Sequence, residues 1–440
     1  MDFSIEHKGL FYLPSNEEDK ISGVIRLDSD GSIILDLIEG YFDTHSVSSI
    51  NKIDQEATIV GYLYSGKKVT LLKCFPQTIQ FQPRTHVESY HVNILLEGVH
   101  FNSFGEVAFK SFGFSSINLG GWINQHNIKH EAVDDGFLIK YKHPAPIIAN
   151  ITNSFSVIIT TKSSRTLTQI EEKSYVQFDF DSPIQFDELL KKQFVFMALL
   201  ELAIGKRQVP IEDYAIINDE SVNIYSGNRR KSAGTEVKRY DMLFSLSEIG
   251  LLRWEDAIKK WYETYEQRRD VYNWYFSLCL MENSFIEQKF LHFTQFLESY
   301  HRKAFPLPSC EKKRRRERIQ NILENIPNVE DREFINGKLL FAHEDSFYDR
   351  ILDLLNKCSL CDELLSGSDR KSLAKKIKLT RNYFTHFTDR KAIFTGDEMF
   401  KAIPRLNVIV QYFLLGDLLF TEEERHAILS PHIRQIVSWL

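Results

Sequence analysis

The first part of the chain alternates between hydrophobic and polar residues in short runs that are rich in β-branched side chains. Two of these runs, Gly23–Asp28 and Gly31–Leu37, are separated by an Asp-Gly pair, which favours a tight turn. Further runs of this kind are Ile59–Tyr64, Val69–Leu72, Phe155–Thr160 and Tyr175–Phe180. Short strands at this spacing predict a β-rich domain of the sandwich or barrel-like kind.

The pattern changes close to residue 186. Phe186–Ile204 is mostly apolar and lacks the strand pattern, which predicts a helix. Residues 211–226 return to a strand-like pattern. The polar segment 227–234 begins and ends with glycine and is a candidate domain boundary.

From about residue 246 the chain follows a helical period. One segment repeats apolar residues at the four-three spacing of a single helix face: Ile286, Phe290, Phe293, Leu297 and Tyr300. Further along, Thr395-Gly-Asp-Glu398 has the form of a capping box, in which Thr and Glu side chains bind each other's backbone N–H groups. This pattern predicts a helix that begins there and continues past Leu406.

These patterns predict an α+β, multi-domain protein with a β-rich N-terminal domain followed by an all-α bundle. At 440 residues the chain is longer than one ordinary core accommodates. We expect the β-rich domain at residues 1–185, a connecting segment of mixed structure at 186–245 and the helical domain at 246–440.

Composition and charge narrow the class of protein. A net charge of −6 argues against coating nucleic acid through bulk positive charge, but it allows a local basic cleft. Five cysteines, an odd number, fit a reducing cytoplasm better than a disulfide framework. The acidic start of the chain differs from a signal peptide, and no run of about 18 apolar residues is present. We therefore expect a cytoplasmic protein without a membrane partner.

The sharpest local feature is the segment Lys378–His386. Asn382 and His386 are four residues apart, so a helix places them on one face. Arg381 lies about 140° from His386 around such a helix, on a stripe that is otherwise apolar (Leu373, Ile377, Phe384). A charge on a packing stripe is costly unless it is paired or faces a cleft. Arg381 therefore either borders a functional cleft or extends to a surface carboxylate.

The Arg-to-His spacing is weak evidence by itself, because two other segments match once four to six intervening residues are allowed. Arg84 and His91 lie in the β-rich half. Between Arg425 and His432 stands Pro431, which a helix interior tolerates poorly. The context of a regular helical period, with a polar Asn directly after the Arg, favours Arg381.

Arg381-Asn-Tyr-Phe-Thr-His386 resembles the Arg-polar-x-x-x-His signature of HEPN domains. The upstream segment Glu287–Arg302 resembles the opening helix of the ApeA-type HEPN branch. Gly9–Pro14 and Ile21–Leu27 resemble the β-rich domain that precedes the HEPN domain in ApeA-like anti-phage proteins. These segments come from both ends of the chain, so the resemblance is to a whole architecture.

This resemblance implies a metal-independent endoribonuclease that acts as a homodimer and uses no cofactor. Its implied catalytic residues are His386, which moves protons near neutral pH, and Arg381, which stabilises charge on the phosphate. Asn382 is expected to orient the His or the phosphate. RNA is the implied substrate, and cleavage by its own 2′-hydroxyl would leave a 2′,3′-cyclic phosphate and a 5′-hydroxyl. The implied biological role is abortive-infection defence, with a phage-derived trigger sensed by the β-rich domain.

Three further features stay open or favour an ordinary structural role. Glu298 is either a polar neighbour of the site or a solvated helix residue. The basic run Lys312–Arg318 is either a solvated helix face or a patch that follows phosphates. Cys358 and Cys361 have zinc-like spacing, but no second pair completes a site. We therefore expect no metal.

Two alternative functions remain at this point. The helical domain could be a non-catalytic binding module, with the β-rich domain recognising a ligand or a phage protein. An enzyme acting through the β-rich domain, for example on carbohydrate, is less favoured because no paired carboxylates stand out there.

Overall fold

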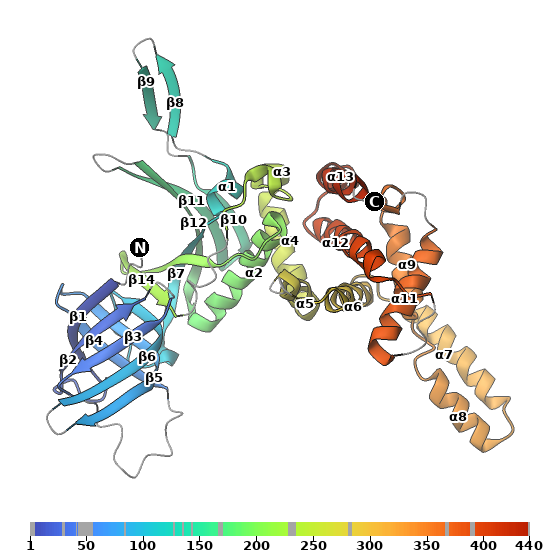
Figure 1. The fold of residues 1–440 in the computed structure, drawn as a ribbon, viewed down its shortest axis with the longest axis horizontal. Helices are drawn as coiled ribbons and strands as arrows, with labels where there is room; N and C mark the ends of the chain where they lie inside the picture. Colours follow the sequence, from blue (N-terminus) through green and yellow to red (C-terminus); the bar gives the residue numbers. More distant parts are fainter. Residues whose placement is uncertain are drawn as a thin grey trace. The chain divides into compact units, whose positions relative to one another are not determined.

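The computed structural model describes most of the chain in two compact units, Met1–Lys259 and Lys260–Leu440 (Figure 1). The described residues are 5–28, 31–40, 42, 56–82, 85–125, 128–133, 136–141, 144–165, 170–227, 235–279, 284–365, 369–387 and 392–438. Most of the predicted boundary at 227–234, and Arg84 with it, lie outside them.

A six-stranded antiparallel barrel forms the first part of the β-rich unit (Figure 1). Its strands are β1 (Ile5–Tyr12), β2 (Ile21–Leu27), β3 (Ile33–Ile38), β4 (Ala57–Leu63), β5 (Lys68–Gln82) and β6 (Thr85–Glu97). They follow the order β6-β3-β2-β1-β4-β5, and β5 pairs with β6 to close the barrel. Alternate residues of β2, among them Ile25 and Leu27, are buried inside, as the period of two predicts.

The long strand β6 links this barrel to a second group of strands. Its first half pairs with β3 (Leu37 with Glu88), and its second half pairs with β14 (Asn223 with Glu97). The sheet continues from β14 in the order β13-β7-β12-β11-β10. These strands are β7 (Ala108–Ser116), β10 (Ile147–Thr152), β11 (Phe155–Arg165), β12 (Ile170–Gln185), β13 (Pro210–Ile217) and β14 (Glu220–Ser226). A separate hairpin consists of β8 (Ile128–Val133) and β9 (Gly136–Tyr141).

Helices cover the second group of strands and bury an aromatic core. They are α1 (Leu119–Ile123), α2 (Phe186–Ile204), α3 (Leu246–Ile249) and the first turns of α4 (Trp254–Gln267), with short 3-10 helices at Phe104–Glu106 and Arg239–Asp241. On α2, Phe196 packs against Phe114 and Phe178 of the sheet and against Trp122 of α1. The predicted helix at 186–204 is confirmed. In the segment expected to connect two domains, β13 and β14 pair with β7 and β6, so these residues belong to the sheet.

The second unit is all-helical (Figure 1). Its helices are α5 (Arg269–Cys279), α6 (Ile286–Ala304), α7 (Ser309–Glu324), α8 (Val329–Leu339), α9 (Phe347–Lys357), α10 (Cys361–Leu365), α11 (Arg370–His386), α12 (Gly396–Asp417) and α13 (Glu422–Ser438). Helix α6 packs against α5, α9, α11 and α12. Four residues of its predicted apolar face are buried and Ile286 is half-buried, and the predicted capping box begins α12. The expected fold class, a β-rich domain followed by a helical bundle, is confirmed.

Asp417 joins three parts of the helical unit. Both of its carboxylate oxygens accept hydrogen bonds from Arg268, each at 2.9 Å. Oδ2 also accepts from the hydroxyls of Tyr272 on α5 and Tyr300 on α6. Burial raises the pKa of both phenols, and the neighbouring Asp417 carboxylate raises it further. The network therefore fixes the end of α12 against the helix that carries Glu298.

Two details of the helical unit concern expectations from the sequence. Helix α13 continues through Pro431, so the prediction that this proline interrupts the helix is wrong. The following His432 is half-buried, and burial lowers its pKa.

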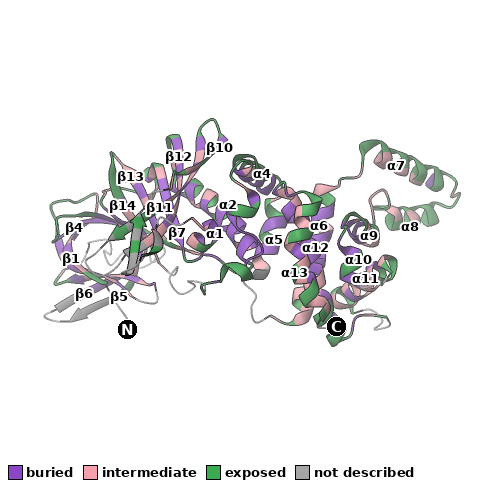
Figure 2. Cartoon of the chain, turned by 90° about the horizontal axis from the view of Figure 1, so that it is seen from above, coloured by how far each residue is buried: buried purple, intermediate pink, exposed green. Residues whose placement is uncertain are grey.

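Among the described residues, no helix has the length and apolar character needed to cross a membrane. In Figure 2, α7 and α8 are mostly exposed, unlike the bundle helices.

Candidate active site on helix α11

Helix α11 carries all three predicted catalytic residues, and its ends are fixed by local hydrogen bonds. At the start, the Asp369 side chain accepts from the backbone N–H groups of Lys371 and Ser372. At the end, Phe387 adopts a left-handed conformation with φ 49°, and its N–H donates to the carbonyl of Tyr383. His386 is therefore the last helical residue.

The Arg381 guanidinium lies at the edge of the packing face, where the side chain is 26% exposed. Its Nη2 is 3.5 Å from Oε2 of Glu298 on α6, and its charge lies 5.2 Å from the ring centroid of Phe347 on α9. Its Nη1 donates to Oδ1 of Asn382 at 3.3 Å. Three contacts from three helices thus hold the guanidinium in one place. Glu298, which the sequence left open, is a direct neighbour of the candidate site.

Asn382 and His386 share a face of α11, but their side chains have different surroundings. Asn382 contacts Arg381, so within this chain it orients the cation. His386 is exposed, and no described residue forms a hydrogen bond with its imidazole. His386 follows Arg381 by five positions, a rise of about 7.5 Å along the helix axis. The structure therefore places the three residues on one helix without bringing His386 to the guanidinium.

An open pocket of about 520 Å³ lies between α5, α6 and α11. Arg381 and Thr385 of α11 line it, and Trp274 of α5 and His292 of α6 contribute rings. The ring centroids of Trp274 and His292 are 4.8 Å apart with an interplanar angle of 17°, so the rings are stacked. Spacing along the sequence did not predict this pocket, because its walls come from helices that meet only in the folded bundle.

A larger groove of about 1490 Å³, with Glu298 in its lining, extends along α7 and the start of α9. Arg314, Arg315 and Arg318 of the predicted basic run line it together with Glu298. Arg315 is paired with Glu311 at 3.3 Å and with Asp345 at 2.9 Å, and Arg314 is paired with Glu311. Carboxylates therefore balance much of the charge that the run brings to the groove.

A buried polar network behind the site was not predicted from the sequence. His301 of α6 is 3% exposed, and its Nε2 lies 2.8 Å from Oδ2 of Asp353 on α9. Its Nδ1 lies 3.5 Å from Nη1 of the buried Arg350. Because arginine only donates, Nδ1 accepts and Nε2 carries the proton. Burial lowers the pKa of His301, so the ring is neutral and joins the helices that supply Glu298 and Phe347.

Cys358 and Cys361, the pair with zinc-like spacing, are both buried at the junction of α9 and α10. Their thiols are hydrogen-bonded to each other, which lowers the pKa of Cys358 and raises that of Cys361. Within the described part of the chain, no group of three or more His, Cys, Asp or Glu side chains is arranged to hold a metal ion.

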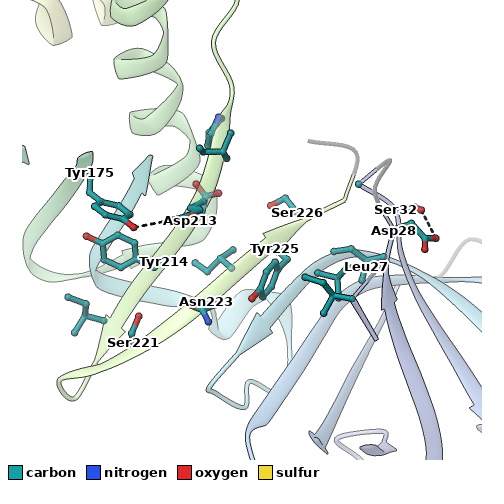
Figure 3. Close-up of a pocket in the computed structure, with 18 of the residues that line it drawn as sticks. Leu27, Asp28, Ser32, Tyr175, Asp213, Tyr214, Ser221, Asn223, Tyr225 and Ser226 are labelled. Atoms are coloured by element: carbon teal, nitrogen blue, oxygen red, sulfur yellow. Dashed lines mark hydrogen bonds between the residues drawn. The ribbon is translucent and has the colours of Figure 1, made fainter. Parts of the chain in front are cut away.

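The β-rich unit contains a separate pocket of about 600 Å³ between the turn after β2 and the faces of β12, β13 and β14 (Figure 3). Tyr175 and Tyr214 lie side by side in it, with ring centroids 5.7 Å apart. The Lys162 ammonium lies 5.4 and 5.7 Å from these two centroids. Tyr214 packs directly over Gly113 of β7, where a Cβ atom would overlap its ring. Because Gly113 has no side chain, the Tyr214 ring has room to occupy this position in the pocket.

Comparison with protein families agrees with this architecture. Residues 6–261, more than half of the chain, match the family model described as ApeA N-terminal domain 1. Residues 291–424, which include α11 and the helices packed around it, match the model described as Apea-like HEPN. Searches of curated proteins and of solved structures found no match. The chain belongs to the family of ApeA N-terminal domain 1 proteins, and its helical unit carries an Apea-like HEPN domain.

Proposed function

We propose that this protein is a metal-independent endoribonuclease of bacterial anti-phage defence, with Arg381, Asn382 and His386 as its catalytic residues. The observation that carries the proposal is the position of Arg381, a partly exposed guanidinium in the wall of a pocket on the same helix as an exposed histidine. The membership of the Apea-like HEPN family supports it, because HEPN domains are usually ribonucleases.

The chemistry required is the attack of an RNA 2′-hydroxyl on the adjacent phosphorus atom. The 2′-oxygen forms a bond to phosphorus as the bond to the 5′-oxygen breaks, which leaves a 2′,3′-cyclic phosphate and a 5′-hydroxyl. A proton must leave the 2′-oxygen and another must reach the 5′-oxygen. His386 is suited to this transfer because an imidazole titrates near neutral pH.

Arg381 stabilises the negative charge that develops on the non-bridging oxygens of the phosphate. Its guanidinium is planar and permanently charged, and it presents donors in a fixed fork. Glu298, Phe347 and Asn382 hold it before substrate arrives, which lowers the cost of ordering it in the transition state. Asn382 therefore acts in this proposal by orienting the arginine.

A homodimer completes the proposed site. Within one chain His386 is exposed and is not among the residues that line the pocket, so a second α11 facing the first would bring two sets of these residues to one cleft. HEPN domains commonly dimerise. Sedimentation of active protein should show a dimer, and a strict monomer with full activity would contradict this part of the proposal.

The β-rich unit is the proposed sensor that restrains the nuclease until a phage-derived trigger is present. The support is chemical: its pocket combines two tyrosine rings, carboxylates and a lysine, a lining suited to binding a ligand (Figure 3). Control of some kind is required, because an unrestrained ribonuclease would destroy the RNA of its own cell.

The test compares wild type with Arg381→Ala and His386→Ala on total RNA in EDTA, after the fold of each protein has been confirmed. We expect wild type to cleave and both variants to lose cleavage. A third variant, Arg425→Ala, removes an arginine of α13 that lies over Tyr412 and lines neither the pocket nor the groove, and it should cleave normally. Equal cleavage by all four proteins would overturn the site, and protection of infected cells by both catalytic variants would favour a binding module instead.

A further inference from the structure

We infer that the pocket between α5, α6 and α11 binds a nucleobase of single-stranded RNA next to the scissile phosphate, with Trp274 as the stacking platform. The inference rests on the proposed function and adds to it the determinant of cleavage preference. It starts from the position of the pocket, whose wall includes Arg381 and Thr385. A group bound there lies beside the guanidinium that is proposed to hold the phosphate.

The aromatic surface of the pocket is exposed and rigid. Trp274 is 42% exposed, a large fraction for a tryptophan whose helix packs against a neighbour. His292 stacks on its indole, and the Nδ1 of His292 lies 2.8 Å from the carbonyl oxygen of Gln288. Since a carbonyl only accepts, Nδ1 donates and fixes the imidazole ring. Proteins that bind single-stranded RNA commonly use such exposed rings to stack unpaired bases.

Three neutral polar side chains of the lining, which also includes the Asp270 carboxylate, are suited to the edge of a base. Gln288, Gln295 and Ser299 present neutral amide and hydroxyl groups from one face of α6. The Gln295 amide donates to the Ser299 hydroxyl at 3.3 Å, which orients both side chains. Amides offer a donor and an acceptor together, the combination that base edges require. A lining of this kind differs from the groove along α7, where arginines and carboxylates dominate.

The Arg381–Glu298 ion pair lies between the two hollows, because Arg381 lines the pocket and Glu298 lines the groove. A strand with one base in the pocket would therefore pass its next phosphate over Arg381. The volume of about 520 Å³ and the open mouth accommodate a base together with its ribose. A double helix does not present its bases in this way, so the ligand is single-stranded.

The test measures binding of 2′-O-methyl RNA, which has no free 2′-hydroxyl and cannot be cleaved, to full-length wild type, Trp274→Ala and Trp274→Phe. Fluorescence anisotropy is recorded with a labelled oligonucleotide and with a series in which each base in turn is replaced by an abasic site. Phe334→Ala is the matched control, because Phe334 is an exposed aromatic of the same unit outside this pocket.

We expect Trp274→Ala to weaken binding about tenfold or more, since stacking of one base typically contributes that much. Trp274→Phe should retain most of the affinity, and Phe334→Ala should behave as wild type. At one position of the RNA, the abasic substitution should weaken binding to wild type. The same substitution should not weaken binding to Trp274→Ala any further, because that variant has already lost the stacking contact. If the losses of affinity from Trp274→Ala and from every abasic substitution are additive, the inference is overturned. Equal binding of RNA by all variants would also overturn it, as would a wild-type protein that binds no single-stranded RNA.

A parallel measurement separates this inference from the nuclease proposal. The bonds that wild type and Trp274→Ala cleave are mapped on the same RNA. A change in the preferred bonds supports the base site, and an unchanged pattern and rate would overturn it while leaving an Arg381-dependent nuclease intact. Conversely, Trp274-dependent binding without any cleavage would overturn the nuclease and leave the base site standing.

Discussion

Glu298 Oε2 lies 3.5 Å from Arg381 Nη2, and the two residues come from helices more than eighty positions apart in the sequence. Glu298 is 16% exposed and also faces Arg302, whose Nη2 is 3.6 Å from its other oxygen. The carboxylate thus has two cationic neighbours, of which Arg302 has a second carboxylate, Glu344, at 3.9 Å. Of these two contacts, the one to Arg381 bears on the proposed chemistry.

Replacement of Glu298 should therefore lower the rate of cleavage more than the affinity for RNA. In Glu298→Ala the guanidinium loses its ionic contact and can turn from the pocket wall, and displacement of a catalytic group by about 1 Å can cost about a hundredfold. We expect kcat to fall about tenfold to a hundredfold with KM little changed. Glu298→Gln, which keeps an acceptor for Arg381, should recover part of the loss.

The matched control for Glu298 is Glu317→Ala, which removes an exposed carboxylate paired with Lys313 on the surface of α7. Its kinetic constants should equal those of wild type. Two outcomes would contradict a positioning role for Glu298: full activity of Glu298→Ala, or a rise in KM alone.

The candidate site shows which features a sequence reveals and which it does not. Arg381 was identified because a charge on an apolar helical stripe is a local anomaly, visible from residues three and four apart. Its partners Glu298 and Phe347, and the Trp274–His292 stack, come from other helices. Their contacts depend on how the bundle packs, which no local period encodes.

In the fold, too, features that depend on short-range spacing were predicted, whereas features that depend on contacts between distant segments were not. The face of α6 and the capping box of α12 depend on short-range spacing, and both predictions are confirmed. The segment at 186–245 was expected to be a connecting segment of mixed structure. Its strands belong to the sheet, because β13 pairs with β7, about a hundred residues earlier. Pro431 was expected to break a helix, but α13 continues through it.

Asp417 should be important for the stability of the helical unit. Asp417→Ala leaves the half-buried Arg268 and the hydroxyls of Tyr272 and Tyr300 without their common acceptor. Removal of one partner from such a network typically costs about 3 kcal/mol in the free energy of unfolding. Chemical denaturation followed by circular dichroism measures the loss. Asp362→Ala, which removes an exposed carboxylate from a surface pair with Arg370, should cost less than about 1 kcal/mol. Equal effects would contradict the role of Asp417.

The β-rich unit should lose stability as the pH rises through the acidic range, in part because of Glu201. Burial raises the pKa of this carboxyl on α2 from 4.5 to about 7. The unfolded chain therefore releases this proton near pH 4.5, whereas the folded chain keeps it until about pH 7. Between these values the folded state binds more protons, so the contribution of Glu201 to stability falls as pH rises.

Glu201→Gln removes this titration and keeps an oxygen for the N–H of Gln208, which donates to Glu201 at 3.1 Å. Relative to wild type, the variant should gain about 2–3 kcal/mol of unfolding free energy between pH 4.5 and 7.5. Denaturation curves at several pH values measure the difference. A difference between the two proteins that is independent of pH would show that Glu201 titrates normally.

The tyrosine pocket of the β-rich unit provides a test of the sensor proposal that leaves the nuclease residues untouched. Gly113→Ala places a methyl group where the Tyr214 ring lies, so the ring must leave its position beside Tyr175 (Figure 3). Burial raises the pKa of Tyr214 to about 12, so its hydroxyl is neutral and donates to Gln177 at 3.0 Å. Tyr214→Phe removes only this hydrogen bond, whereas Gly113→Ala displaces the ring.

In cells challenged with phage, we expect Gly113→Ala and Tyr214→Ala to reduce protection at least tenfold in plaque counts, while Tyr214→Phe keeps most of it. The Tyr214 ring is a large apolar surface of the pocket lining, whereas its hydroxyl adds only about 1 kcal/mol. Both damaging variants must still fold and bind RNA as wild type does, which separates loss of sensing from loss of the nuclease. If they protect fully with the ring displaced, the trigger acts elsewhere on the β-rich unit, because a binding pocket cannot lose one of its walls without loss of affinity for its ligand.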